Sequence, residues 1–408
     1  MPLYIKKCRN CNSKSIINLF SLGKIRFTGK FPKYKEKIPH GELNLVMCKS
    51  CKLVQLKHIF NMSYLYNKDY GYRTGINLTM SNHVKNVVKK ISKIAKLKNG
   101  DNVLDIASND GTLLRNYNSK IKTWGIDPIL IKFKKEYKKI NHKISNFFDH
   151  KLILKKNKKT KFKIITALSV FYDLENPNIF LNGIKRLLHK DGIFYLEFQD
   201  LMMIIKHNMF DTICHEHLEY YSVTFINKLL KKHNLKIFDH SYNDINGGSS
   251  AYLISHNNSK YKTNQNKINK ILLKEKRFGI EKVSTYKKFK RKINSLKQKL
   301  NLKIKKIIKN KKIIHGYAAS TKGNVLLQYY NLDNKKIKFI SDRNTKKENL
   351  YTPGSNIKII SEKDSRNLKP DYYLVLAWHF KKEILAREKM IRKMGTKFIF
   401  PLPNIEII

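Results

Sequence analysis

No segment of the 408-residue chain reaches the ~18 consecutive apolar residues that a membrane-spanning helix needs. The first residues, Met-Pro-Leu-Tyr-Ile-Lys-Lys, likewise lack an apolar signal region. These two absences predict a cytoplasmic protein without a membrane partner. At this length the chain can form two or three domains, each with a hydrophobic core of its own.

Acidic residues are scarce, because 30 Asp and Glu stand against 84 Lys and Arg, and the formal net charge is +54. Such an excess ordinarily indicates a polyanionic partner. Lysine is nevertheless spread over every segment together with many Asn and Ile, and arginine, which reads bases and phosphates better, is rare. We therefore interpret the charge as a compositional bias on solvated faces. A basic zinc-containing protein that binds or methylates RNA is kept only as a less favoured alternative.

Cysteine occurs only five times, and four of the five form two Cys-x-x-Cys pairs. In a reducing cytosol that spacing indicates a metal site rather than disulfides. Four thiolates complete the tetrahedral shell of Zn²⁺ and leave no open position for water, so we predict a structural zinc without a catalytic role. The predicted ligands are Cys8, Cys11, Cys48 and Cys51.

The chain also lacks a full Gly-x-Gly-x-x-Gly phosphate motif, but it contains the strand and the small-residue turn in which such a motif lies. A buried strand over 103–106 enters a small-residue turn, in which Ala107 and Gly111 remain, and a helix is expected next. The following strand ends in Asp127, whose carboxylate can accept hydrogen bonds from both hydroxyls of a ribose. An amphipathic helix over 78–98 is predicted to precede this unit.

Three further strands, over 144–148, 162–171 and 192–198, alternate with helical stretches, which predicts a parallel sheet wrapped by helices. Their order resembles a class I S-adenosylmethionine methyltransferase rather than a dehydrogenase, which more often keeps the phosphate motif. The resemblance implies a set of residues at S-adenosylmethionine, with Asp127 at the ribose and the aromatic pair near the adenine. This set is Asp105, Ala107, Asn109, Gly111, Asp127, Phe147, Phe148 and Ser169.

The segment 208–222 crowds two histidines together with several acids and tyrosines. In an extended conformation His215 and His217 share one face, and Glu216 points to the other. One imidazole could then act as a general base, because imidazole titrates near neutral pH. Two other interpretations agree equally well with the segment: a turn whose polar groups are all hydrogen-bonded, or a metal site to which the two histidines supply two ligands. Neither a Ser/His/Asp spacing nor a His-Glu-x-x-His helix is present to decide between them.

The tyrosine-rich stretch 64–75 is compatible with an aromatic lid over a pocket or with a linker. Residues 246–254 are expected to form a tight turn that feeds a strand, and 264–310 to form surface or connecting helices. The C-terminal part then begins with a strand, a small-residue turn and a helix. Backbone amides there, with Ser320 and Lys322, could seat a diphosphate. The alternative is a second fold of the nucleotide-binding type whose turn binds no ligand.

Taken in order, these motifs closely resemble the sugar C-methyltransferase family, which makes branched deoxysugars on nucleotide carriers. The resemblance implies an α/β protein with four regions: a zinc-binding module (1–75), a Rossmann-like S-adenosylmethionine-binding domain (76–205), an active-site segment with connecting helices (206–310) and a C-terminal Rossmann-like domain for the sugar nucleotide (311–408). The motifs are the Cys₄ head, Asp-x-x-x-Asn-Asp-Gly from 105, His-Glu-His-Leu at 215–218, Tyr-Tyr-Ser at 220–222, Asn-Gly-Gly at 246–248, Ser-Thr-Lys-Gly-Asn at 320–324, Tyr-Thr-Pro-Gly at 351–354 and Ala-Trp-His-Phe at 377–380.

The resemblance also implies a reaction and an arrangement of residues. A base removes the proton next to the ketone of a nucleotide-linked 4-keto sugar, and the enolate takes the sulfonium methyl group. By similarity the base is His217, Glu216 supports it, and the enzyme is a monomer. The residues expected at the sugar nucleotide are Asn246, Gly247, Ser320, Lys322, Asn324, Tyr351 and Trp378.

Two positions depart from the family pattern. Cys214 stands where the family has a tyrosine, and Asp173 where it has a histidine. A thiol is a weak donor and cannot replace a phenol that steadies an enolate, so His215, Tyr70 or Tyr72 would take over that role, or the acceptor differs. Methylation of an oxygen or nitrogen of a related carrier-linked sugar is the corresponding alternative.

Overall fold

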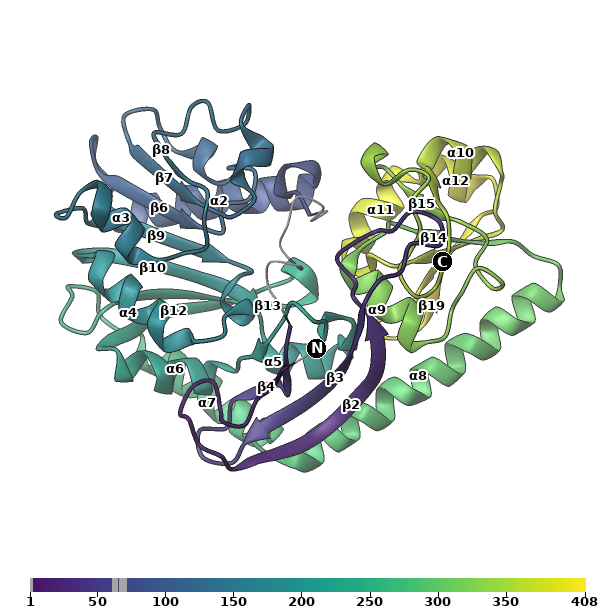
Figure 1. The fold of residues 1–408 in the computed structure, drawn as a ribbon, viewed down its shortest axis with the longest axis horizontal. Coiled ribbons are helices and arrows are strands. Elements are labelled where there is room, and N and C mark those ends of the chain that lie inside the picture. Colours follow the sequence, from purple (N-terminus) through teal and green to yellow (C-terminus); the bar gives the residue numbers. More distant parts are fainter. Residues whose placement is uncertain (1–2, 61–64, 66–71) are drawn as a thin grey trace.

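Three large β-sheets organise the protein (Figure 1). The computed structural model describes residues 3–60, 65 and 72–408. Two of the sheets belong to α/β units that lie side by side, and the third is a curved ribbon that reaches from the first unit to the second (Figure 1). The two α/β units and the loops next to the ribbon line one cavity.

The curved ribbon is built mainly from N-terminal residues. At its far end the N–H of Arg26 donates to Oε1 of Gln328 over 2.8 Å, which attaches the ribbon to the second α/β unit. A short strand from much later in the chain completes the opposite edge. In sheet order the strands are β11 (Glu219–Tyr220), β4 (Val54–Leu56), β3 (His40–Cys48) and β2 (Ile16–Arg26), while β1 (Leu3–Tyr4) pairs separately with β5 (His58–Ile59).

The first α/β unit contains a seven-stranded sheet. In sheet order its strands are β12 (Leu235–Asn243), β13 (Ser249–His256), β10 (Leu188–Gln199), β9 (Phe162–Leu168), β6 (Asn102–Ile106), β7 (Lys122–Ile126) and β8 (His142–Ile144). The strands from β10 to β8 run parallel, as predicted, and β13 runs antiparallel to both of its neighbours, β10 and β12. The sheet therefore extends to His256, beyond the boundary expected at residue 205, because β13 pairs with β10.

Helices pack against this sheet in two separate hydrophobic clusters, since successive strand residues face opposite sides. The predicted amphipathic helix forms as α2 (Leu78–Ala95) and ends where Lys96 adopts a left-handed φ of 49°. Its buried stripe consists of Val84, Val87, Val88 and Ile91. The other helices of the unit are α3 (His150–Lys156), α4 (Pro177–Leu187), α5 (Leu201–Lys206) and α6 (Val223–Lys232).

Three predicted elements of this unit differ from those observed. The helix expected after residue 111 is a single 3-10 turn, η2 (Leu114–Asn116), because Asp110 accepts hydrogen bonds from the N–H and the hydroxyl of Thr112 and holds a local turn instead. Strand β8 ends early, so that 145–148 form a loop, and β9 ends before Ser169, whose φ is 55°. Both loops contribute walls of the cavity.

The second α/β unit has a six-stranded sheet that is parallel except for its last strand, as the predicted βα alternation requires. In sheet order the strands are β16 (Ile359–Ser361), β15 (Ile340–Asp342), β14 (Ile314–Tyr317), β17 (Tyr372–Val375), β18 (Lys397–Phe400) and β19 (Glu406–Ile407). Its helices are α9 (Thr321–Tyr329), α10 (Glu362–Asn367), α11 (Lys381–Arg387) and α12 (Lys389–Lys393).

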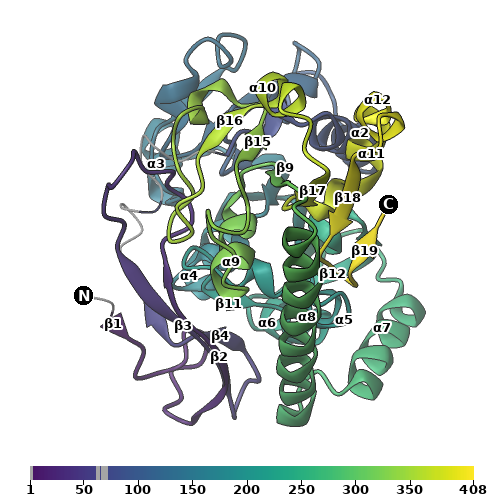
Figure 2. The same ribbon diagram turned by 90° about the vertical axis from the view of Figure 1, so that its right-hand side faces the viewer.

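Two helices connect the units, α7 (Gln265–Phe278) and α8 (Val283–Lys309). Helix α8 runs lengthwise along the second unit (Figure 2). Its apolar side, which includes the buried Tyr286, Ile293 and Leu300, belongs to the same hydrophobic cluster as β2 and the six-stranded sheet. The predicted helices are confirmed, but α8 is a core element as well as a connection. None of the helices in the described part of the chain is both long enough and apolar enough to cross a membrane.

Candidate active site

A cavity of about 440 Å³ opens where the three sheets meet. The carboxyl edge of the seven-stranded sheet forms one side, and the turn before α9 forms another. The loop after β2 adds Gly29 and Phe31 to the wall, and the segment before α2 adds Tyr72 and Thr74. Ligands of α/β folds bind beyond the carboxyl ends of parallel strands, so this is the expected place for the reactants.

The donor side of the cavity is organised around Asp127 at the end of β7. One carboxylate oxygen of Asp127 accepts the N–H of Asn109 over 2.9 Å, and the other accepts the N–H of Ile129 over 2.8 Å. Each carboxylate oxygen has a second lone pair, so Asp127 can still accept hydrogen bonds from ribose hydroxyls. The structure brings most of the expected donor residues together on this wall: Asp105, Ala107, Asn109, Asp127, Phe147 and Ser169.

The turn after β6 has the backbone shape that such a site needs. Ala107 and Asn109 both adopt positive φ, at 56° and 48°. Gly111 has a φ of 71°, and a Cβ there would lie 2.7 Å from Cδ1 of Ile140. Only glycine fits that position without strain. The turn, Asp127 and the exposed ring of Phe147 together fit S-adenosylmethionine.

Two of the expected donor residues lie behind the cavity wall instead of on it. Gly111 faces Ile140 and Tyr137, so its role is to let the turn pack closely. Phe148 packs against Phe180, with centroids 4.9 Å apart, because adjacent residues of the 145–148 loop point in opposite directions. Phe147, its neighbour, is the ring that remains exposed.

Buried carboxylates on this side are unusually basic. Burial raises the pKa of Asp105 to about 7, although the hydroxyl of Thr166 donates to it over 2.6 Å and opposes the rise. Burial likewise raises the pKa of Asp127, against the two backbone bonds that favour its charged form. Such groups favour positively charged or hydrogen-bonding ligand atoms, as an amino group and ribose hydroxyls would provide.

Residues 72–75, the end of the tyrosine-rich stretch that was compatible with a lid or a linker, close this side. The N–H of Thr74 donates to Oδ1 of Asn109 over 3.0 Å, and the N–H of Gly75 donates to Oδ2 of Asp110 over 3.0 Å. Arg73 adds an ion pair with Asp110 at 3.0 Å. These bonds hold the exposed side chain of Tyr72 at the cavity. Tyr70, the other tyrosine expected here, lies outside the described residues.

The histidine segment forms a turn, and the extended conformation expected from the sequence is wrong. The N–H of His217 donates to the carbonyl oxygen of Cys214 over 3.2 Å, which reverses the chain within four residues. The two imidazoles consequently face different surroundings. His217 lines the cavity together with Glu216, whereas His215 does not.

His215 is part of the core beneath the ribbon. Its ring lies 4.5 Å from that of Phe27 and 4.8 Å from that of Phe60, and its Nε2 lies 3.3 Å from the carbonyl oxygen of Gly41. Burial lowers the pKa of His215 to about 3, so the ring is neutral. His215 does not line the cavity, so its position favours a packing role over contact with the reactants.

The protonation of His217 follows from its hydrogen bond. Nδ1 lies 2.7 Å from the carbonyl oxygen of Thr212, which can only accept, so the proton is on Nδ1 and Nε2 carries a lone pair. Burial, and then the charge of Lys322, lowers the pKa of His217 to about 3. The ring of Tyr172, also on the wall, lies against it. The sequence showed Tyr172 only as an aromatic residue near the end of a strand.

The two positions that depart from the family pattern lie in different places relative to the cavity. Cys214 is fully buried and is not on the cavity wall, and burial raises the pKa of its thiol. Asp173 does line the cavity, next to Tyr172. Glu216 lies on the same wall close to Gly29, where a Cβ would be 2.7 Å from its Oε1. Burial raises the pKa of Glu216.

On the opposite side, three of the seven residues expected at the sugar nucleotide line the cavity: Asn246, Ser320 and Lys322. Ser320 caps α9, accepting the N–H of Gly323 over 3.0 Å. The Lys322 ammonium donates to the carbonyl oxygen of Asn246 over 3.2 Å. Lys322 thus reaches across the cavity to the first α/β unit.

The other four residues expected there join parts of the protein, and none of them lines the cavity. The amide of Asn324 donates to the carbonyl oxygen of Thr28 over 2.8 Å. The indole N–H of Trp378 donates to Asp211 over 2.8 Å, and a Cβ on Gly247 would meet the same indole at 2.7 Å. The ring of Tyr351 packs against that of Tyr34, with planes inclined by 43°, outside the cavity. These residues belong to motifs that were expected to bind a ligand. Contacts between parts of a protein also require particular side chains at particular positions, so the two roles cannot be told apart from the motif alone.

The sequence did not identify several charged residues on the cavity wall. Asp342 is the last residue of β15 and accepts the N–H of Ala319 over 2.7 Å. Arg343 donates to the carbonyl oxygen of Ile76 over 2.6 Å and so bridges the second unit to the start of α2. Lys347 and Arg387 also line the cavity. An acid at the end of the second strand of a Rossmann-like unit was a recognisable signal.

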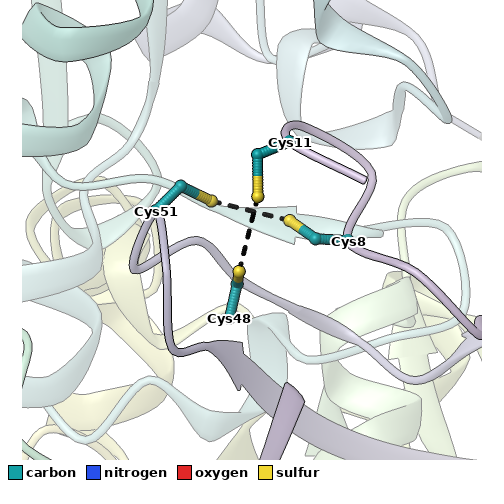
Figure 3. A group of neighbouring side chains, drawn as sticks. All are labelled: Cys8, Cys11, Cys48 and Cys51. Atoms are coloured by element: carbon teal, nitrogen blue, oxygen red, sulfur yellow. Dashed lines mark hydrogen bonds between the residues drawn. The ribbon is translucent and has the colours of Figure 1, made fainter. Parts of the chain in front are cut away.

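The four cysteines of the N-terminal pairs converge on one point (Figure 3). Their sulfur atoms all lie within 4.8 Å of one another, with 3.5 Å between Cys8 and Cys51 and 3.6 Å between Cys11 and Cys48. Zn–S bonds of about 2.3 Å arranged tetrahedrally place sulfurs about 3.8 Å apart, so the group fits zinc. The amide of Gln55 donates to Cys8 over 3.3 Å. Four thiolates close the shell, which makes this site structural.

Three family models match successive parts of the chain. A zinc-binding domain matches residues 8–66, a methyltransferase domain 71–240 and a C-methyltransferase C-terminal domain 244–403. The C-methyltransferase NovU of Streptomyces niveus is 27% identical over 424 residues, covering 99% of this chain and 97% of the relative. The chain is an S-adenosylmethionine-dependent methyltransferase. This confirms the predicted fold class, enzyme class, methyl donor and zinc-binding module.

Solved structures resemble the methyltransferase over a smaller part. A methyltransferase from Clostridium acetobutylicum is 15% identical and covers 43% of this chain and 92% of its own, with a TM-score of 0.35. Magnesium protoporphyrin IX methyltransferase from Synechocystis is 14% identical and covers 44% and 88%, with a TM-score of 0.33.

Proposed function

We propose that the enzyme methylates a carbon next to the ketone of a nucleotide-linked keto sugar, with His217 as the base that forms the enolate. The hydrogen bond from Nδ1 of His217 to the carbonyl oxygen of Thr212, at 2.7 Å, carries this proposal. It leaves Nε2 unprotonated on a ring that lines the cavity. An imidazole held in this way favours accepting a proton over donating one.

The two sides of the cavity support a substrate that has a nucleotide part. The second Rossmann-like unit shares two features with the donor side, a small-residue turn after a strand and an acid, Asp342, at the end of the next strand, and it adds a capped helix after the turn. In this fold an acid at that position commonly accepts ribose hydroxyls. Arg343 and Lys347 add positive charge nearby, which suits phosphate groups. The motifs that resemble the sugar C-methyltransferase family point to the same class of substrate.

The residues of the chain supply positioning and proton transfer. When bound, S-adenosylmethionine supplies an electrophilic methyl group. Asp127 holds the donor's ribose, and the facing unit holds the sugar nucleotide, so both reactants meet at the carboxyl edge of the sheet. His217 accepts the proton at Nε2, and Glu216 in the same turn stabilises the imidazolium that results.

Hydrogen exchange without methyl donor tests the base directly. The enzyme is incubated in D₂O with dTDP-, GDP- and CDP-linked 4-keto-6-deoxyhexoses, and deuterium next to the ketone is followed by NMR and mass spectrometry. Separate reactions with S-adenosylmethionine identify which sugar is methylated. Exchange is expected at the carbon that is later methylated. A sugar that is methylated but shows no exchange at that carbon would rule out enolate formation by His217.

Methylation of an oxygen or nitrogen of a carrier-linked sugar is the second candidate. The observation that favours it is Asp173, which lines the cavity at a position where the family has a histidine. A carboxylate there is suited to accept a hydroxyl or amino proton. The attachment of a ¹³C-labelled methyl group, read from product NMR, distinguishes carbon from oxygen or nitrogen.

A further inference from the structure

Lys322 occupies a place in the cavity that its expected role in a diphosphate seat does not explain. Its side chain leaves α9 in the second unit and ends at Asn246, in the turn between β12 and β13 of the first unit. The ammonium nitrogen lies 3.2 Å from the carbonyl oxygen of Asn246. Burial lowers the pKa of Lys322, although the charge of Asp211 opposes this.

A series of hydrogen bonds connects Lys322 to the proposed base. The carbonyl oxygen of Asn246 also accepts from the amide of Gln199, over 2.8 Å. Oε1 of Gln199 in turn accepts the hydroxyl of Thr212, whose carbonyl oxygen holds Nδ1 of His217 at 2.7 Å. Lys322 is therefore connected to the residues that hold His217, although it belongs to α9 of the second unit.

The ammonium group retains unused hydrogen-bonding capacity. An ammonium has three N–H donors. Within residues 3–60, 65 and 72–408, the carbonyl oxygen of Asn246 is the one acceptor bonded to it. Oδ2 of Asp211 accepts the indole N–H of Trp378 over 2.8 Å, and neither oxygen of this carboxylate is bonded to the ammonium group within the described residues. A desolvated cation with spare donors favours an anionic oxygen as its partner.

Two of the groups considered for steadying an enolate are turned away from the cavity. Cys214 is fully buried behind the wall, and His215 packs between two phenylalanine rings. Tyr72 lines the cavity, and Tyr70 lies outside the described residues. Lys322 differs from Tyr72 because its charge acts on His217 and because the hydrogen bonds above connect the two residues.

We propose that the Lys322 ammonium group binds the enolate oxygen that forms when His217 removes a proton, which makes Lys322 a catalytic residue and not a diphosphate ligand. This inference rests on the function proposed above. Nε2 of His217 takes the proton from the carbon next to the ketone, and the electrons of that C–H bond form the C=C bond. The π electrons of the carbonyl move onto its oxygen, where Lys322 offsets the new charge. Return of a deuteron by the same path gives exchange.

The electrostatics of the empty cavity agree with this role. Lys322 helps to lower the pKa of His217, because two positive charges close together in a poorly solvated cavity repel one another. A negative oxygen beside Lys322 cancels that repulsion, so His217 becomes a stronger base as the enolate forms. Preorganised donors in a water-poor site act mainly on such developing charge.

The test is the exchange reaction in D₂O without methyl donor, using whichever keto-sugar nucleotide of the panel the wild-type enzyme exchanges. Lys322→Met and Lys322→Gln remove the charge, Lys322→Arg keeps it, and Lys299→Met is the matched control, since Lys299 is exposed on α8. Circular dichroism and S-adenosylmethionine binding establish that each variant is folded. Maximal exchange rate and KM are measured separately for each.

Loss of a single oxyanion donor typically costs about 10²–10³ in kcat, so we expect a loss of that order in the maximal rate of K322M and K322Q, with KM changed less than about threefold. Lys322→Arg should recover at least a tenth of the wild-type rate, and K299M should equal wild type. A loss below tenfold in both neutral variants, or an effect confined to KM, would overturn the assignment of Lys322. Failure of the wild-type enzyme to exchange any methylated sugar would instead overturn the proposed function.

Discussion

The phenol ring of Tyr172 lies against the imidazole ring of His217, with centroids 4.2 Å apart and planes inclined by 48°. Tyr172 belongs to η4 (Phe171–Asp173), directly after β9 of the donor sheet. His217 belongs to the turn that leads into β11 of the ribbon. This ring contact and the bond from Nδ1 to Thr212 restrain the imidazole from two directions, so its Nε2 has one defined direction in the cavity.

Tyr172 is expected to matter as a ring and not as a hydroxyl. Tyr172→Phe keeps the contact with His217 and should lower the exchange rate less than about fivefold. Tyr172→Ala removes the restraint and should lower it ~10- to 100-fold, since small misplacements of a reacting group are costly. Initial exchange rates in D₂O check both variants. A loss in Tyr172→Phe as large as in Tyr172→Ala would mean that the phenol itself takes part.

The two histidines of the turn should separate function from stability. His217→Asn removes the base and should lower exchange by about 10²–10⁴, while thermal stability and S-adenosylmethionine binding remain close to wild type. His215→Asn is the matched substitution in the core between Phe27 and Phe60. It should lower the free energy of unfolding by ~1–3 kcal/mol with near-normal activity of the folded fraction. The reverse pattern would exchange the roles assigned to the two side chains.

The pH dependence of exchange should lack the acid limb of an ordinary histidine. Burial, and then Lys322, lowers the pKa of His217 to about 3, and the ring can accept a proton only above its pKa. We expect kcat/KM for exchange to stay nearly constant from about pH 8 to about pH 5.5, where a base with a pKa of about 6.5 would have lost about 90% of its active form.

Removing the charge of Lys322 should move the acid limb of the kcat/KM profile to higher pH. In Lys322→Met the repulsion is absent while burial remains, so the pKa of His217 should rise part of the way towards its ordinary value. The acid limb of kcat/KM is the measurement. A wild-type limb near pH 6.5, or an unchanged limb in the variant, would contradict the arrangement of the two groups.

Zinc should be needed to hold the cavity wall in place rather than for proton removal or methyl transfer. Cys48→Ser should lose the bound metal, and the ribbon should unfold locally, since structural zinc contributes on the order of 10 kcal/mol in small zinc-binding peptides. Gly29 and Phe31 would then leave the wall, and exchange should fall more than about tenfold. Metal content per chain and exchange rate are measured together. Cys214→Ser is the matched control, because Cys214 lies outside the cluster and should leave the zinc content unchanged.

Local spacing in the sequence was sufficient for several features. Two Cys-x-x-Cys pairs present four thiolates wherever the intervening chain goes, so the zinc module could be predicted without its fold. The strand before Ala107 and the strand before Asp127 could be predicted in the same way, because burial and turn chemistry act over a few residues. Helix α2 followed from the helical spacing of its apolar residues.

Side-chain direction at the active site could not be predicted in this way. Whether His215 or His217 faces the reactants depends on a turn that forms because the chain must pass from the donor sheet into β11 of the ribbon. The alternation expected of an extended segment does not apply once Cys214 and His217 are bonded across that turn.

The sequence by itself determined the class of enzyme, the zinc ligands and the donor-binding strands, since these depend on residues close together in the chain. Tertiary structure alone decided which residues meet in the cavity. Lys322 reaches His217 through Asn246 only because the second α/β unit docks on the first, and Trp378 and Asn324 serve that docking rather than a ligand. Contacts between segments so far apart follow from how the whole chain packs, which no local pattern specifies.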